Sequence, residues 1–206
     1  MEKLDVGLVY TQSFRLGLKN FFSIIGTYLL WIITIWIPYI NVGTTIAFLS
    51  LPLELSKGKV ISPTYIFDSK YRQRMGEFFI LCGLKWIVLM AGMMFLIIPG
   101  LVMNIAYSMS LYIMLDRNVN PLEALKASNE TTYGNKWRIF FSLLLVALTI
   151  EFGMLILGIL TSSIGIIGVL ISAIVLILSI AWLIAVNAVV YKELTTNSAD
   201  EAITIQ

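Results

Sequence analysis

The stretch "IFFSLLLVALTIEFGMLILGILTSSIGIIGVLISAIVLILSIAWLIAVNAVVY" occupies residues 139–191, and Glu151 is its only charged residue. Two other runs, 24–52 and 87–114, carry no charged residue at all. A helix of about 20 apolar residues is long enough to cross the hydrocarbon core of a bilayer. The sequence therefore predicts an all-α integral membrane protein.

The composition of the whole chain supports this class. Of its 206 residues, 59% are hydrophobic and 13% are charged, whereas about 25% are charged in an average globular protein. The net charge of +2 is too small to indicate nucleic-acid binding. Because histidine is absent and Cys82 is the single cysteine, the chain offers no Ser-His or Cys-His pair and no His/Cys zinc set. We expect neither an enzyme nor a bound cofactor.

Three helix starts recur at nearly equal spacing, at Asp5, Ser62-Pro63 and Asn120-Pro121. Asp, Ser and Asn cap free N–H groups, and proline is well tolerated in the first turn. A basic and aromatic segment follows each start: "SFRLGLKNFF" (13–22), "SKYRQRMGEFF" (69–79) and "SNETTYGNKWRIFF" (128–141). An apolar region then follows, broken by proline or glycine at 38–43, 99–100 and 161–168.

This pattern predicts six transmembrane helices arranged as three hairpins, each preceded by a short amphipathic interfacial helix. The chain would form a single membrane domain over 1–194, with pseudo-threefold repeat units at about 1–57, 58–117 and 118–194, and a short flexible tail over 195–206. The first span, 21–37, is shorter than the hydrocarbon core, so the first hairpin thins the bilayer or stops short of the far face. The alternative is that helix starts and aromatic pairs recur by chance in an apolar sequence.

The basic residues indicate the orientation in the membrane. Apart from Lys85, they fall before the first span, between the second and third, between the fourth and fifth, and after the sixth. The three turns on the opposite side carry no charge. Since basic loops remain cytoplasmic, both termini of this multi-pass protein are expected in the cytoplasm.

The candidate functional residues fall into two groups. Lys70, Arg72 and Arg74 follow the second helix start and are candidate contacts for lipid head groups or for a membrane-protein partner. The alternative is that such residues only anchor and orient the hairpins. The second group contains the polar residues of the spans, which are Glu151, Lys85, Asn104 and Asn187. Glu151 near mid-bilayer is the strongest candidate, either as a neutral, hydrogen-bonded structural carboxyl group or as a group that binds a ligand or moves protons. Lys85 is expected to extend toward the cytoplasmic interface, and the two asparagines are expected to bond between helices.

Part of the sequence resembles a known family. The segment 98–140 contains a proline-glycine pair, an acidic residue, an "EALK" motif, a serine, a glycine and an aromatic residue, which are Pro99-Gly100, Asp116, Glu123-Ala124-Leu125-Lys126, Ser128, Gly134 and Trp137. In this order they resemble bacterial membrane proteins related to the membrane domain of glycerophosphoryl diester phosphodiesterases. The resemblance implies a six-helix bacterial inner-membrane protein. It carries over no catalytic residue, because the chain has no soluble segment long enough for the phosphodiesterase domain.

Three functions remain open from the sequence. The first is a non-enzymatic inner-membrane scaffold or accessory protein, in envelope or lipid homeostasis, with membrane lipids and a membrane protein as partners. The second is a small transporter or channel that uses Glu151, because transport pathways need polar residues between spans. The third is a membrane-embedded lipid enzyme, for which only Glu151, Lys85 and a few hydroxyl groups are candidates.

Overall fold

The computed structural model describes residues 3–204, and within this range the chain is helical with no strand. The α-helices are α1 (Val6–Lys19), α2 (Phe21–Thr34), α3 (Ile40–Leu49), α4 (Leu51–Ser56), α5 (Ser69–Gln73), α6 (Met75–Phe95), α7 (Ile97–Ala106), α8 (Ser110–Arg117), α9 (Pro121–Thr132), α10 (Lys136–Thr161) and α11 (Ile166–Thr204). Two 3-10 helices, η1 (Pro63–Phe67) and η2 (Ser162–Ile164), complete the set.

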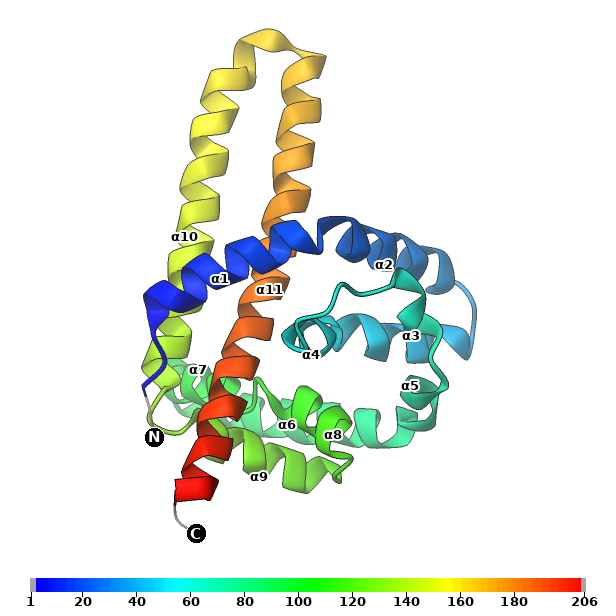
Figure 1. Cartoon of the computed structure of the whole chain (residues 1–206), viewed down its shortest axis with the longest axis vertical. Coiled ribbons are helices and arrows are strands. Elements are labelled where there is room, and N and C mark those ends of the chain that lie inside the picture. The colour runs from blue at the N-terminus through cyan, green and yellow to red at the C-terminus, as the bar shows by residue number, and fades with distance from the viewer. Residues whose placement is uncertain (1–2, 205–206) are drawn as a thin grey trace.

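The antiparallel pair α10 and α11 dominates the shape of the molecule (Figure 1). Its outer half, which ends in the turn at η2, projects beyond every other helix, whereas its inner half enters the body formed by α1 to α9. Helices α1, α2 and α6 run crosswise to this hairpin in the same view. The arrangement is therefore one projecting hairpin mounted on a body of shorter helices.

Helix α1 is joined closely to α11. Asp5 caps α1 by accepting hydrogen bonds from the backbone N–H groups of Gly7 at 2.8 Å and Leu8 at 3.2 Å. Farther along, the indole Nε1 of Trp182 donates to Ser13 Oγ at 2.9 Å, in a buried contact. A Cβ atom on Gly17 would lie 3.3 Å from the Cα of Trp182, so the absence of a side chain allows the two backbones to approach.

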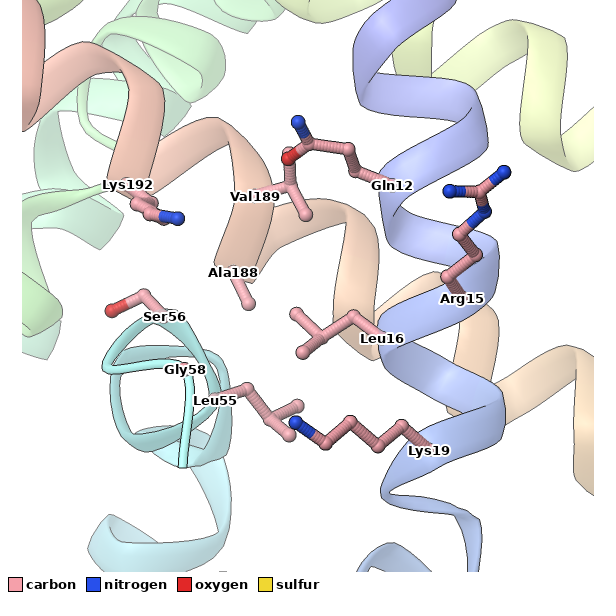
Figure 2. Close-up of a pocket in the computed structure, with 10 residues that line it drawn as sticks. All are labelled: Gln12, Arg15, Leu16, Lys19, Leu55, Ser56, Gly58, Ala188, Val189 and Lys192. Carbon is pink, nitrogen blue, oxygen red and sulfur yellow. The ribbon is translucent and has the colours of Figure 1, made fainter. Parts of the chain in front are cut away.

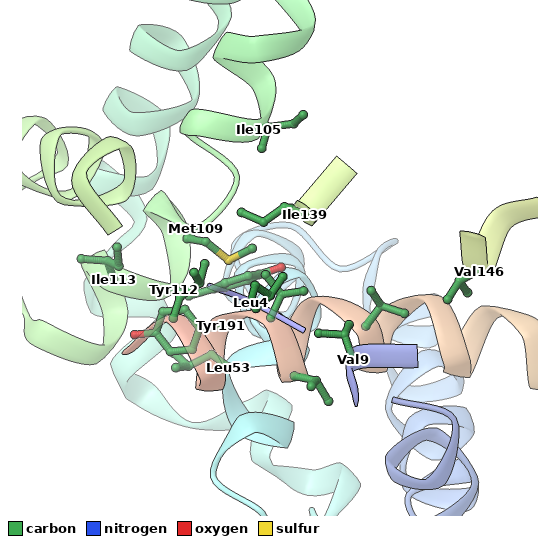
Figure 3. Packing of buried hydrophobic residues seen from close by; sticks show 14 of the residues in the cluster. Leu4, Val9, Leu53, Ile105, Met109, Tyr112, Ile113, Ile139, Val146 and Tyr191 are labelled. Atoms are coloured by element: carbon green, nitrogen blue, oxygen red, sulfur yellow. The ribbon is translucent and has the colours of Figure 1, made fainter. Parts of the chain in front are cut away.

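The main apolar core joins the inner half of the hairpin to the rest of the body (Figure 3). Val186 and Tyr191 of α11, Ile139 of α10, Met109 and Val9 are all buried within it. Burial of a side chain of this size stabilises the fold by about 1.5–3 kcal/mol. The inner half of α11 is therefore fixed by the core, and the outer half is not.

Helices α7 and α8 are separated by a break that α9 fills. At the break, Ser128 Oγ donates to the carbonyl oxygen of Ala106 at 2.7 Å and accepts from the backbone N–H of Met109 at 3.2 Å. Thr132 Oγ1 donates to the same carbonyl at 3.4 Å. Broken helices leave backbone groups without partners, and hydroxyl groups can satisfy them. Helix α9 is therefore half-buried, and only one of its sides is exposed.

Four of the described helical segments are long and apolar enough to cross a membrane: Met75–Met94, Ile97–Arg117, Lys136–Thr161 and Ile166–Thr196. A fifth is obtained if α1 and α2, which are bent by 67° relative to each other, are one broken span. Helices of this length and composition indicate a membrane protein. The predicted six spans are not confirmed, because in the first unit α2 has 14 residues and α3 has 10.

The breaks in the apolar regions fall partly where the sequence predicts them. The turn at η2 lies within the predicted interval, with Gly165 at φ +54°. The break predicted at Pro99-Gly100 is wrong, since α6 ends at Phe95 and both residues lie in α7. Proline is tolerated there because the first turn of a helix has no hydrogen bond to lose. Gly100 is buried against Met93 of α6.

The helix starts are also confirmed only in part. Asn120 caps α9 by accepting from the backbone N–H of Glu123 at 2.9 Å, as predicted. Ser62 precedes a 3-10 helix and bonds to Thr64 at 2.8 Å instead of capping it. At the other end of the chain α11 continues to Thr204, within the segment 195–206 that the sequence assigns to a short flexible tail; residues 205–206 lie outside the described range.

Candidate functional site

A charged pocket lies where α4, α5 and α8 meet. Glu54 is its central group, and one oxygen, Oε1, accepts three hydrogen bonds. The donors are Lys57 Nζ at 3.0 Å, Lys70 Nζ at 3.0 Å and the hydroxyl group of Tyr71 at 3.1 Å. Tyr71 is fully buried in a second apolar cluster, which also contains Ile46 and Ile66. The network therefore joins the end of α4 to α5 across a short intervening segment.

The electrostatics of this network favour its charged form. Burial on its own raises the pKa of Glu54, but hydrogen bonds from Lys57 and Lys70 outweigh burial and hold that pKa below its ordinary value. Burial lowers the pKa of Lys70, yet the bond to Glu54 leaves the net pKa raised. Burial raises the pKa of Tyr71 to about 12, so its hydroxyl group remains a donor at neutral pH. The pair Glu54 and Lys70 is thus ionised, with Tyr71 neutral.

The pocket has a volume of about 390 Å³, and its lining also includes Arg74, Leu115, Asp116 and Asn118. Arg74 Nη1 lies 3.4 Å from Glu77 Oε1. Asp116 Oδ2 accepts from the hydroxyl group of Tyr191 at 2.9 Å, which links α8 to α11. The pocket presents both signs of charge, and most of its charged groups already bond within the chain. The main effect of these bonds is to hold α4 to α5 and α8 to α11.

The structure brings two of the three predicted head-group contacts, Lys70 and Arg74, into this pocket. Lys70 is held by Glu54, and Arg74 is held by Glu77. Arg72 packs over Gly43 of α3 and donates to the carbonyl oxygen of Phe67 at 3.3 Å. All three cations therefore have acceptors in their own chain, with which a head group would compete.

The predicted intramembrane residues do not form a common site. Glu151 is exposed on the outer half of α10, and Lys85 and Asn104 are partly or fully exposed on α6 and α7. Within residues 3–204 these three side chains make no hydrogen bond or ion pair. Asn187 donates to the carbonyl oxygen of Leu183 in its own helix at 3.2 Å. Its predicted bond to another helix is not found in the described structure.

The central residues of the pocket, Glu54 and Tyr71, were not among the residues predicted from the sequence. A signal for Glu54 exists, since it is the only acidic residue between Asp5 and Asp68 and lies in the apolar segment "LPLELS" (51–56). Tyr71 lies between two basic residues and carries no such signal. Among residues 3–204 no group of three His, Cys, Asp or Glu side chains comes together as a metal site.

Comparison of this chain with protein-family models, with curated proteins and with solved structures finds no match.

Proposed function

We propose that the protein is a non-enzymatic scaffold or accessory protein of the bacterial inner membrane, in envelope or lipid homeostasis. The proposal includes six spans in three pseudo-repeated hairpins, of which the first is short, and both termini in the cytoplasm. The distribution of basic residues supports this orientation. The resemblance of segment 98–140 to membrane domains of glycerophosphoryl diester phosphodiesterases is a second support.

The observation that carries the scaffold role is the projecting outer half of the hairpin. Among the described side chains of 147–178, only Gly168 is buried. Large apolar side chains line both helices there, for example Leu155 at 61% exposed, Ile159 at 67% and Ile166 at 78%. Lipid tails or another membrane helix would cover such a surface. A packed body that presents an exposed apolar arm is suited to binding another membrane protein.

The test is purification of the full chain in mild detergent, followed by identification of retained proteins and lipids. We expect a membrane protein at a fixed ratio to the chain. Leu155→Ala with Ile159→Ala should reduce this ratio, because both side chains lie on the projecting arm. The matched control is Ile87→Ala with Met90→Ala on α6, which are 66% and 46% exposed. Recovery of lipid alone from the unaltered chain would contradict a scaffold role.

Glu151 favours a second candidate function, that of a small transporter or channel. Its carboxyl group is exposed on an apolar arm and has no partner among residues 3–204. A charged side chain in that environment costs several kcal/mol unless it is neutralised or paired. If Glu151 takes part in transport, Glu151→Gln should abolish the phenotype that the intact protein confers and leave thermal stability in detergent unchanged. Under the scaffold role, Glu151→Gln keeps the phenotype.

A further inference from the structure

A second pocket lies between α1, α4 with its following turn, and α11 (Figure 2). Its volume is about 230 Å³. Lys19 extends into it from α1, and Lys192 lies at its edge on α11. Arg15 also lines it from α1, with its guanidinium directed along the helix and away from Leu55 and Ala188. Leu16, Leu55 and Ala188 provide an apolar floor. Three cations from two helices thus line a hollow that has an apolar base, and we call it the cationic pocket.

The charge of the cationic pocket is not neutralised by the chain. No acidic residue lines it, and among residues 3–204 none of its three cations makes an ion pair. This is unlike the Glu54 pocket, where one carboxylate oxygen holds both Lys57 and Lys70. Arg15 and Lys19 are four residues apart on one helix face, where like charges repel each other. A bound anion would remove that repulsion.

The surroundings of α1 indicate what kind of anion fits. Phe14 and Leu18, which are 46% and 49% exposed, border an apolar hollow of about 180 Å³ against the outer half of α11. Helix α1 therefore separates an apolar side, next to the projecting arm, from a cationic side, next to the body. This is the arrangement of a helix at the boundary between acyl chains and head groups. Guanidinium and ammonium groups together are typical of phosphate recognition.

We propose that the cationic pocket binds the phosphate of an anionic phospholipid, whose acyl chains lie against the apolar side of α1 and the projecting arm. Arg15 bonds two phosphate oxygens, and Lys19 and Lys192 supply point charges. The inference rests on the membrane location in the proposed function and is independent of the scaffold role. It differs from the predicted head-group contacts at Lys70, Arg72 and Arg74, whose donors are already bonded within the chain.

The test measures lipid binding to the purified full chain in detergent micelles by native mass spectrometry and by thermal stabilisation. The probes are phosphatidylglycerol, zwitterionic phosphatidylcholine, glycerol 3-phosphate and inorganic phosphate. We expect phosphatidylglycerol to bind most tightly. One basic residue near an anionic lipid increases the affinity for that lipid about fivefold. The triple change Arg15→Gln, Lys19→Gln and Lys192→Gln should therefore weaken the binding of phosphatidylglycerol about a hundredfold.

The matched control removes the same charge elsewhere, through Lys59→Gln, Arg117→Gln and Lys126→Gln, at three exposed cations outside both pockets. We expect binding to this variant within about twofold of the unaltered chain. An equal loss in both variants would show that only net charge matters and would overturn the proposal. Equal binding of glycerol 3-phosphate or inorganic phosphate would overturn the assignment to a lipid.

A single substitution keeps the proposal falsifiable if the triple variant does not fold. Lys192 is exposed at the rim of the pocket, so Lys192→Gln should fold and weaken binding of phosphatidylglycerol about fivefold. Lys126→Gln should leave that binding unchanged. Equal affinities of these two variants would overturn the proposal. Retention of phosphatidylglycerol without a protein partner would contradict the scaffold role and support the lipid site.

Discussion

At the scale of single residues, Glu54 and Ser128 hold the body together through polar bonds in otherwise apolar surroundings. Glu54 Oε1 accepts from Lys57, Lys70 and Tyr71, and Ser128 Oγ bridges the break between α7 and α8. The sequence shows that both residues are polar, but it does not show which distant groups form hydrogen bonds with them. Such partners depend on the packing of helices that are far apart along the chain.

Replacing Glu54 by Gln should lower the free energy of unfolding by about 1–2 kcal/mol, because the amide loses the charge that both lysines share. This estimate is discounted for the 45% and 48% exposure of the Lys57 and Lys70 side chains. The measurement is thermal unfolding in detergent at neutral pH. The control is Glu130→Gln, whose exposed pair with Lys126 spans 4.0 Å. A larger effect at Glu130 would contradict the role given to Glu54.

The same residue predicts a dependence of stability on pH. The pKa of Glu54 is lowered in the folded state from 4.5, so its contribution is complete above pH 4.5 and is lost as the pH falls through the lowered value. The difference in unfolding temperature between the unaltered chain and Glu54→Gln should therefore be constant near neutrality and shrink on acidification below 4.5. A difference that grows on acidification would be inconsistent with this pKa direction.

Replacing Ser128 by Ala should cost about 1–3 kcal/mol, because it leaves the buried N–H of Met109 without its partner. The matched control is Ser142→Ala, since Ser142 is equally buried and bonds only the carbonyl oxygen of Arg138 in its own helix. Thermal unfolding of the two variants in the same detergent measures the difference. Equal loss of stability would show that the bridge between α7 and α8 contributes nothing beyond burial.

At the scale of helices, features that depend on neighbouring residues in the sequence were predicted well, whereas the packing of helices against one another was not. The caps at Asp5 and Asn120 and the turn after α10 depend on neighbours in the sequence, and the structure confirms them. The end of α6 at Phe95 was missed because it depends on the approach of α7, where Gly100 lies against Met93. For the same reason the Glu54 pocket could not be found from spacing alone. Its groups come from three separate helices.

The glycines of the projecting hairpin give a prediction at this scale. A Cβ atom on Gly168 would meet the carbonyl oxygen of Thr161 and lie 2.9 Å from the Cβ of Thr161, whereas nothing lies within 4 Å of one on Gly158. Gly168→Ala should therefore open the turn and lower thermal stability. Gly158→Ala should leave stability unchanged or raise it by about 0.5–1 kcal/mol. Loss of stability only in the second variant would contradict this arrangement of the hairpin.

At the scale of the whole molecule, the class of protein was predictable and the arrangement of its helices was not. Composition and apolar runs are sufficient to predict a helical membrane protein, and four helices have the required length. The spatial relation between spans depends on contacts such as Trp182 with Ser13, which composition does not contain. Figure 1 accordingly shows α6 crosswise to α10 and α11, an arrangement that the pattern of repeated hairpins does not indicate.

Because of this crosswise arrangement, each hairpin needs its own test of sidedness. In a Cys82→Ser background, single cysteines at Asn41, Leu96 and Ser162 report the three uncharged turns, and cysteines at residues 70 and 130 report the charged segments. Basic segments stay in the cytoplasm, so the three turns should react with an impermeant thiol reagent in intact cells. Residues 70 and 130 should react only after permeabilisation. Labelling at Ser162 without labelling at Leu96 would show that α10 and α11 cross the bilayer while α6 and α7 do not, and labelling at residue 70 or 130 in intact cells would overturn the orientation.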